Sequence, residues 1–394
     1  MGNGKLSRRT FITSTGIATL ASAVTPCGSG EFAQARTDTD SHLSPGTGVP
    51  RVLHQTDLFH EHGDPDDHFD LATLFALQVM GKIDLVGVVL DYPPAHRKGD
   101  PGVLPLAQMN RMCGTAVPAA VGTSRQMAKP FDSLPDLPRQ DSAAINLILK
   151  TLRESDRPVA LTCAGSATDI AAASLREPDL FRNKCSKVYL NAGGAFPNPD
   201  KPDMLEFNAR LNPLAYQALF SLPCPLCWFP CWHTVEIRKP GERGTFYWLP
   251  HEKVFEGISS QLKNYFLYMF DKSGSTKWLA ALNGEPDPGR WRKILKERRG
   301  MWSTASILDI AGLAVSKEGE LLPKEQIDAG NALYGLDQVD VSCGSSGRTE
   351  WKPADSDSAE RTNERLMFHL FHPDAYPGAM AQAVNTLFKV FGDL

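Results

Sequence analysis

The chain has 394 residues, of which 42% are hydrophobic and 22% are charged, so it is long and apolar enough for a large core. Its formal net charge is −4, and the basic residues are scattered along the sequence. Nucleic-acid-binding proteins normally gather basic residues on one surface, so we expect no nucleic acid partner.

The first 35 residues predict an export signal. Arg8 and Arg9 directly precede a short, modestly apolar run, and a small-residue cleavage site follows at 33–35. The paired arginines favour the twin-arginine route over a chance pair in a disordered tail, so we expect a periplasmic or extracellular protein. The run is too short and too rich in Ser and Thr to span a membrane.

Residues 36–49 are rich in turn-forming residues and predict a linker, which leaves 50–394 as the folded domain. Cys27 raises the question of lipidation, but Pro26 directly before it fits that processing poorly. The sequence leaves both lipidation and a homo-oligomeric state open.

Short apolar runs alternate with helical patterns from residue 51 onward, which predicts an α/β domain with a mainly parallel central sheet flanked by helices. The predicted strands are 52–56, 84–91, 116–122, 158–164 and 187–195, and the predicted helices are 67–80, 103–113, 142–154 and 168–175. Ligands of such sheets bind beyond the carboxyl ends of the strands. Asp57, Asp91, Gly165 and Asn191 lie at these ends.

Six acids crowd the segment between the first strand and the first helix: Asp57, Glu61, Asp64, Asp66, Asp67 and Asp70. One interpretation is an acidic helix start, since the helix dipole favours anions there. That accounts for one or two acids. A hard divalent cation prefers oxygen ligands, and a shared cation explains Asp57 together with the Asp66 and Asp67 pair.

The segment "MLEFNARLNPLAYQALF" predicts a short strand with Glu206 and Asn208 on one face, followed by a helix near Pro213. An Asn beside a Glu suits the recognition of neighbouring hydroxyl groups. A surface turn before the helix is the alternative.

The segment "CPLCWFPCWH" has near-zinc spacing of Cys224, Cys227, Cys231 and His233. Its flanks favour a strand, in which neighbouring thiols point to opposite faces. We therefore predict that the three cysteines lie along one strand as buried thiols without a common metal.

Two helical stretches, 252–271 and 275–298, predict a helical insertion over the strand ends. Farther on, Asp309 is a lone acid in the apolar segment "MWSTASILDIAGLAV". The residues alone leave open whether it caps a helix or binds a cation.

Five blocks of the chain resemble, in order, the inosine-uridine-preferring nucleoside hydrolases, in a divergent branch of that superfamily. The blocks are "TD" with "GDPDD", "ALTCAGSATDIA", "VYLNAGGAF", "EFNARLNPLAYQALF" and "ILDIAGLAV". They cover nearly the whole chain from about residue 51. The resemblance implies a nucleoside hydrolase-like fold.

The resemblance also implies a calcium site. Asp57 would bind the ion and act as the base that deprotonates water, and Asp67 would be a second carboxylate ligand. Thr168 would supply its main-chain carbonyl, and Asp309 would complete the site. A cation lowers the pKa of bound water, which suits attack on an oxocarbenium-like sugar.

For the ribose hydroxyls, the resemblance implies Asp66, Glu206, Asn208 and Asn198. The chain also departs from the family pattern. Eight residues separate Asp57 from the acid pair, Leu308 stands where purine-preferring relatives have a His, and Asn212 stands where an Asp is usual.

These features together predict an exported, calcium-dependent hydrolase that cleaves the N-glycosidic bond of a ribonucleoside or similar small ribosyl substrate. A hydrolase of another glycosyl substrate is one alternative. A catalytically idle sugar-binding protein with the same fold is the other, and the missing His favours it.

Overall fold

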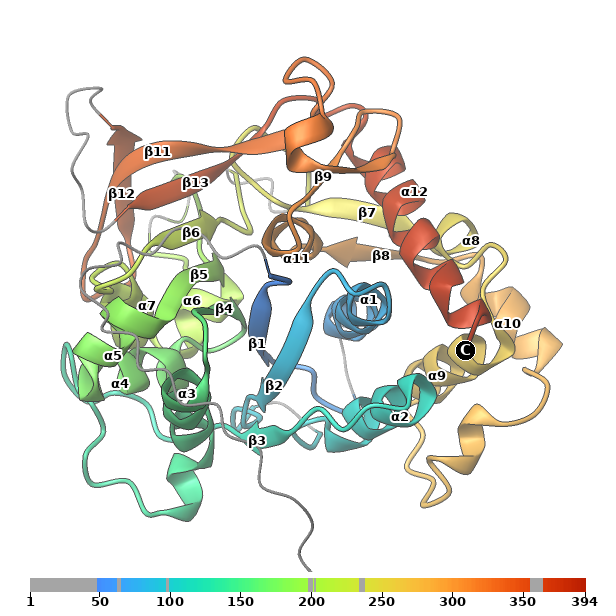
Figure 1. Ribbon diagram of the computed structural model, residues 1–394, viewed down its shortest axis with the longest axis horizontal. Coiled ribbons are helices and arrows are strands. Elements are labelled where there is room, and N and C mark those ends of the chain that lie inside the picture. Colours follow the sequence, from blue (N-terminus) through green and yellow to red (C-terminus); the bar gives the residue numbers. More distant parts are fainter. Residues whose placement is uncertain are drawn as a thin grey trace, which may run out of the picture. The chain divides into compact units, whose positions relative to one another are not determined.

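A nine-stranded sheet forms the centre of the fold (Figure 1). The computed structural model describes residues 48–61, 65–96, 99–197, 201, 203–233, 238–354 and 364–394. The strands of the sheet are β1 (Arg51–Thr56), β2 (Asp84–Leu90), β3 (Ala119–Val121), β4 (Val159–Ala164), β5 (Cys185–Asn191), β6 (Leu226–Phe229), β11 (Tyr334–Cys343), β12 (Thr349–Pro353) and β13 (Arg365–Leu370).

The sheet has the order β12-β11-β13-β6-β5-β4-β1-β2-β3. All neighbours from β3 to β13 are parallel, whereas β11 runs antiparallel to both β12 and β13. The predicted, mainly parallel sheet is therefore confirmed. The antiparallel pair extends one edge and brings the β11–β12 hairpin beside the end of β5.

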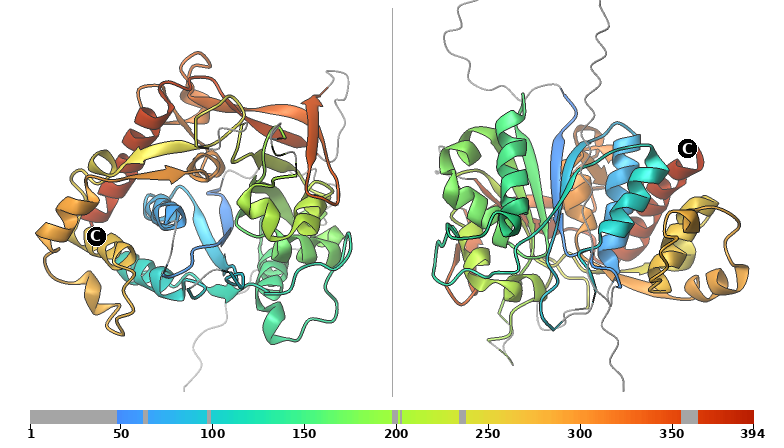
Figure 2. Two further views of the ribbon diagram at one scale, coloured as in Figure 1. Left: turned by 180° about the vertical axis from the view of Figure 1, so that it is seen from behind. Right: turned by 90° about the horizontal axis from the view of Figure 1, so that it is seen from below.

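Helices cover both faces of this sheet (Figure 2). They are α1 (Asp66–Val79), α2 (Val103–Cys113), α3 (Ala143–Glu154), α4 (Thr168–Arg176), α5 (Pro178–Lys184), α6 (Phe207–Leu211), α7 (Pro213–Leu219), α8 (His251–Val254), α9 (Ser260–Phe270), α10 (Pro288–Ile294), α11 (Thr304–Ile310) and α12 (Tyr376–Lys389). One layer contains α1, α2, α11 and α12, and the other contains α3, α4, α5 and α7.

Alternation along the strands divides the interior into two cores. Val52 of β1 packs with the α1 layer, whereas its neighbour Leu53 packs with the α3 layer. Val88 and Val89 of β2 divide in the same way. Strands buried on both faces are normally continuous apolar runs, as β2 is, whereas β1 also buries His54, Gln55 and Thr56.

The region between two short antiparallel strands, β7 (Tyr247–Pro250) and β8 (Arg298–Met301), differs from the prediction. The expected helix over 252–271 is two helices, α8 and α9, because Gly257 has a φ of 71° and Ser259 caps α9 through the Leu262 N–H. A second short pair, β9 (Leu313–Val315) and β10 (Leu321–Pro323), follows α11.

The insertion packs mainly on the α1 layer. The Phe266 ring of α9 lies 4.6 Å from the Phe69 ring of α1. It reaches the strand ends through His60, whose Nε2 lies 2.7 Å from the Ser273 carbonyl and whose ring stacks 5.1 Å from Tyr268. The insertion therefore touches the loop after β1 rather than covering the whole edge.

Residues 47–394 form one compact unit. The predicted export signal, Cys27, Asp64 and Asn198 all lie outside the described residues. Within the described part of the chain, no helix is both long enough and apolar enough to cross a bilayer.

Candidate functional site

The carboxyl ends of β1, β2, β4 and β5 meet at one edge of the sheet. The Asp57 N–H donates to the Ala164 carbonyl at 3.2 Å, and the Asp91 N–H donates to the Thr56 carbonyl at 3.0 Å. Asp57 therefore lies between the ends of two neighbouring strands. This edge is where parallel sheets bind ligands.

Asp57 and Asp67 are in contact at this edge. Both are buried, with 6% and 5% of their surface exposed, and their carboxyl groups hydrogen-bond to each other. The Thr56 hydroxyl donates to Asp67 Oδ1 at 2.5 Å. Burial raises the pKa of Asp67 well above its usual range, and the negative charge of half-buried Asp66 raises it further. The structure thus brings together the three acids predicted at the start of α1.

Asp91 extends this acidic group. Its Oδ1 accepts from Gln55 Nε2 at 2.8 Å, and its Oδ2 accepts from the Ser166 N–H at 2.5 Å. Burial raises the pKa of Asp91 well above its usual range, and Asp57 raises it further. Gly165 is required here, because a Cβ at that position would lie 2.3 Å from Asp91 Oδ2. The sequence places Asp91 at this edge, at the end of the strand next to β1, but assigns it no role in the site.

The first turn of α11 also contacts α1, the helix that carries Asp66, Asp67 and Asp70. The Thr304 hydroxyl donates to Asp70 Oδ1 at 2.7 Å, and the Tyr247 hydroxyl donates to Thr304 at 3.0 Å. Burial raises the pKa of Asp70 to about 7. Asn191 Nδ2 at the end of β5 donates to the Ser306 hydroxyl at 2.8 Å.

Asp309, the last of the predicted ligands, has a cationic partner within the fold. Its Oδ1 lies 2.5 Å from Lys324 Nζ, and its carboxylate hydrogen-bonds to Tyr189. It lies five positions after Thr304, about 7.5 Å farther along the helix and on a different face. Among the described residues, no group of three or more His, Cys, Asp or Glu side chains is placed to hold a metal ion.

The predicted carbonyl ligand Thr168 is the first residue of α4, so it lies just after the carboxyl end of β4, and its role toward a cation stays a prediction. Its hydroxyl accepts from Asn212 Nδ2 at 2.9 Å and lies 2.8 Å from the Ser166 hydroxyl. Thr168 therefore links two loops.

Glu206 and Asn208 do not lie on a strand. Glu206 caps α6, and its Oε2 accepts from the N–H groups of Asn208 and Gly193 at 2.9 and 2.8 Å. Burial raises the pKa of Glu206, and these donors oppose the shift. Asn208 Nδ2 donates to the Asn191 carbonyl at 3.0 Å, so both residues still reach the carboxyl edge.

The cysteines occupy three environments rather than one strand. Only Cys227 lies within β6, and Cys224 contacts Cys185 on the α3 side of the sheet. Cys231 lies at the carboxyl edge, where Glu206 and the α1 acids help to raise its pKa after burial. All three thiols are buried.

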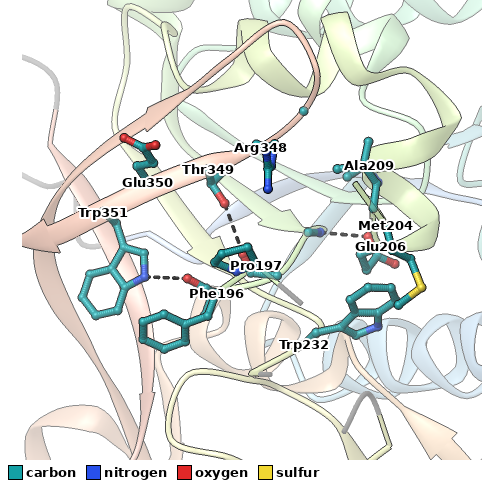
Figure 3. A pocket seen from close by; sticks show the side chains of 15 residues that line it. Phe196, Pro197, Met204, Glu206, Ala209, Trp232, Arg348, Thr349, Glu350 and Trp351 are labelled. Carbon is teal, nitrogen blue, oxygen red and sulfur yellow. Dashed lines mark hydrogen bonds between the residues drawn. The ribbon is translucent and has the colours of Figure 1, made fainter. Parts of the chain in front are cut away.

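A pocket of about 400 Å³ adjoins the acidic group through Glu206 (Figure 3). Its walls come from the loop after β5, the segment before α6, the residue Trp232 after β6, and the start of β12. No described acid of β1 or α1 lines it. The edge of the sheet therefore presents an acidic centre and a separate, less polar pocket beside it.

Comparisons with known proteins identify the family of the chain. The model of the family "inosine-uridine preferring nucleoside hydrolase" matches residues 62–279. Over 92 residues, the chain is 32% identical to the pyrimidine-specific ribonucleoside hydrolase RihA of Enterobacter sp. strain 638 and to that of Citrobacter koseri. Each match covers 23% of this chain and only 29% of the relative.

Two solved structures are similar over most of the chain. The purine-preferring ribonucleoside hydrolase from Gardnerella vaginalis has a TM-score of 0.49 at 13% identity, covering 86% of this chain and 99% of that one. The inosine-uridine preferring nucleoside hydrolase from Bacillus anthracis has a TM-score of 0.45 at 14% identity, with the same coverage. Since the family model matches more than half of the sequence, the chain belongs to the inosine-uridine preferring nucleoside hydrolase family.

Proposed function

We propose that the protein hydrolyses the N-glycosidic bond of a ribosyl substrate with a divalent cation held by Asp57 and Asp67. The observation that carries the proposal is the contact between these two buried carboxyl groups, with Asp66 beside them. Family membership supports the reaction class. The names of the relatives refer to ribonucleosides, which makes a nucleoside the first substrate to test.

The two carboxyl groups fit a hard cation. Their oxygens already approach within hydrogen-bonding distance, and two ligands of one calcium ion lie at most about 5 Å apart. Buried carboxylates repel each other unless a positive charge separates them. Calcium is the cation we propose, because every nearby donor is an oxygen.

In the proposed reaction, the bound cation lowers the pKa of a water molecule. Asp57 accepts the proton that this water loses as it attacks the sugar. Asp66, Glu206 and Asn208 hold the ribose hydroxyls, the last two from the start of α6 beside the end of β5. The hydrogen bonds of the first turn of α6 fix Glu206 and Asn208, so that little reorganisation is needed.

Leu308 of α11 has no proton to donate to the departing base, and its side chain is fully buried in the hydrophobic core. We therefore expect faster hydrolysis of substrates whose leaving group needs no proton. General acids typically contribute about 10²- to 10⁴-fold, so the preference should be of that size.

Export remains a proposal that rests on Arg8 and Arg9. Lysine at both positions should retain the full chain in the cytoplasm of a host with the twin-arginine pathway. Equal export of both forms would contradict it.

The proposed activity is tested with the purified protein on p-nitrophenyl riboside, inosine and uridine, each with calcium or with a chelator. We expect calcium-dependent release of p-nitrophenol, faster than release of either base, and its loss in Asp67→Asn. Tight binding of ribose without turnover would instead identify a sugar-binding protein.

A further inference from the structure

The pocket beside Glu206 is built by a hairpin outside the family match. Thr349 and Trp351 of β12 donate hydrogen bonds to the Gly194 and Ala195 carbonyls at 3.1 and 2.7 Å. At the tip, Gly347 has a φ of 79°, and a Cβ there would lie 3.0 Å from Leu205. The hairpin is thus fixed to both segments that position Glu206.

Aromatic side chains form much of the wall (Figure 3). The ring of Phe196 is 43% exposed, an unusual state for a large apolar side chain within a cavity. It lies 5.6 Å from the Trp351 ring, and Trp232 lines another part of the wall. A planar aromatic group would cover this apolar surface.

Arg348 contributes a cation to the same pocket. Its only ion pair within the described chain is a long one, 3.9 Å to Asp203, whose side chain is 95% exposed. Glu350 lines the same pocket (Figure 3), but within the described chain no ion pair joins its carboxylate to Arg348. The Glu206 carboxylate accepts hydrogen bonds from the backbone N–H groups of Gly193, Asn208 and Ala209. Arg348 can therefore pair with an anion.

The position of the pocket decides which part of a substrate it can hold. The scissile C–N bond must lie near Asp57 and Asp67, and neither residue lines the pocket. Glu206 is shared, and in the proposed function it binds the sugar. A group in the pocket is therefore attached to the sugar at the end remote from the scissile bond.

We infer that the substrate is an extended ribosyl compound, in which a phosphate-type linker near Arg348 carries a second planar aromatic group against Phe196 and Trp232. This inference rests on the proposed function for the bond that is cleaved. Water oxygen joins C1, the base leaves with the electrons of the C–N bond, and Asp57 takes the water proton. A cationic pyridinium-type base leaves neutral and needs no proton.

Nicotinamide adenine dinucleotide and nicotinamide riboside provide a matched pair of probes, since they share the leaving group and differ only in the extension. With calcium, we expect kcat/KM for the dinucleotide to exceed that for the riboside by at least about tenfold, mainly through KM. Hydrolysis of both at equal efficiency would overturn the inference and leave the proposed function intact.

Substitutions in the pocket test whether its residues cause the preference for the dinucleotide. Phe196→Ala and Arg348→Ala should each reduce the preference for the dinucleotide roughly tenfold and leave riboside hydrolysis unchanged. Phe131→Ala and Arg292→Ala remove an exposed ring and an exposed cation that do not line the pocket, and they should have no effect.

Calorimetry decides the case in which neither probe is hydrolysed. The proposed function then fails, but the full chain should still bind the dinucleotide at least about tenfold more tightly than the riboside. Phe196→Ala should abolish that difference. Equal affinities, or a difference that survives in Phe196→Ala, would overturn the inference.

Discussion

Asp67 and Asp309 are two buried acids on helices of the same layer, yet their surroundings are opposite. Both are about 5–6% exposed. Asp67 faces Asp57, Asp66 and Asp70, with no cationic side chain among the groups that shift its pKa. Asp309 faces Lys324, which supplies a positive charge within the fold. A buried carboxylate is neutralised by a counter-charge or a proton, so a bound cation would stabilise the first, whereas Lys324 already serves the second.

This contrast shows what the apolar context around Asp309 leaves open in the sequence. A lone acid in an apolar helix looks the same in sequence whether a lysine or a metal ion neutralises it. Lys324 directly follows β10 and lies 15 residues after Asp309 in the sequence. The pairing of β9 with β10 brings it back beside α11. The substitutions below are designed to break or sharpen the contrast.

The largest expected effect is on turnover. Asp67→Asn should lower kcat/KM for p-nitrophenyl riboside by roughly 10³-fold, or ~4 kcal/mol of transition-state stabilisation, because a negative charge at the cation site is lost. Asp309→Asn should change it by less than about threefold. Similar losses in both variants would show that the two acids share one role.

A smaller effect concerns Asp169, a third buried acid, which accepts from the Thr123 N–H at 3.2 Å. Burial raises its pKa to about 7, against about 3.9 in an unfolded chain. The folded state then binds more protons between these values, so stability falls as pH rises from about 4 to 7.

Asp169→Asn cannot ionise and should remove this part of the pH dependence. Relative to the wild type, the variant should gain about 1–4 kcal/mol of unfolding free energy between pH 5 and pH 8. Urea denaturation at the two pH values measures it. A gain at pH 5 that equals the gain at pH 8 would contradict the assignment.

A modest effect on stability is expected when Asp309 loses its cationic partner. Lys324→Met leaves the Asp309 carboxylate with Tyr189 alone and should reduce the unfolding free energy by about 1–2 kcal/mol, since the lysine is 41% exposed and partly screened. Lys324→Arg should retain most of the stability. Unchanged denaturation of Lys324→Met would mean that the pair contributes nothing.

Much of the fold could be predicted, because strands buried on both faces and amphipathic helices have regular apolar patterns. The helix over 103–113 was predicted with its observed bounds. The predicted helix over 252–271 failed at Gly257 and Ser259, which are recognisable stop and start signals. Glu206 resembled a strand residue because a helix of five residues is too short to show a period.

The site was predictable only where its residues are local. Asp57, Asp66 and Asp67 come from one strand–helix junction, and the structure brings them together. The β11–β12 hairpin had no signal, since it reaches the site from more than 100 residues beyond Glu206. Such long-range placement depends on sheet order, which no local pattern encodes.

Calcium titration of the full chain by calorimetry tests the central claim most directly, because it requires no substrate. The wild type and Asp309→Asn should bind one calcium ion with dissociation constants within about threefold, and Asp67→Asn should bind at least about 100-fold more weakly. Loss of binding in Asp309→Asn, with binding retained in Asp67→Asn, would contradict the account.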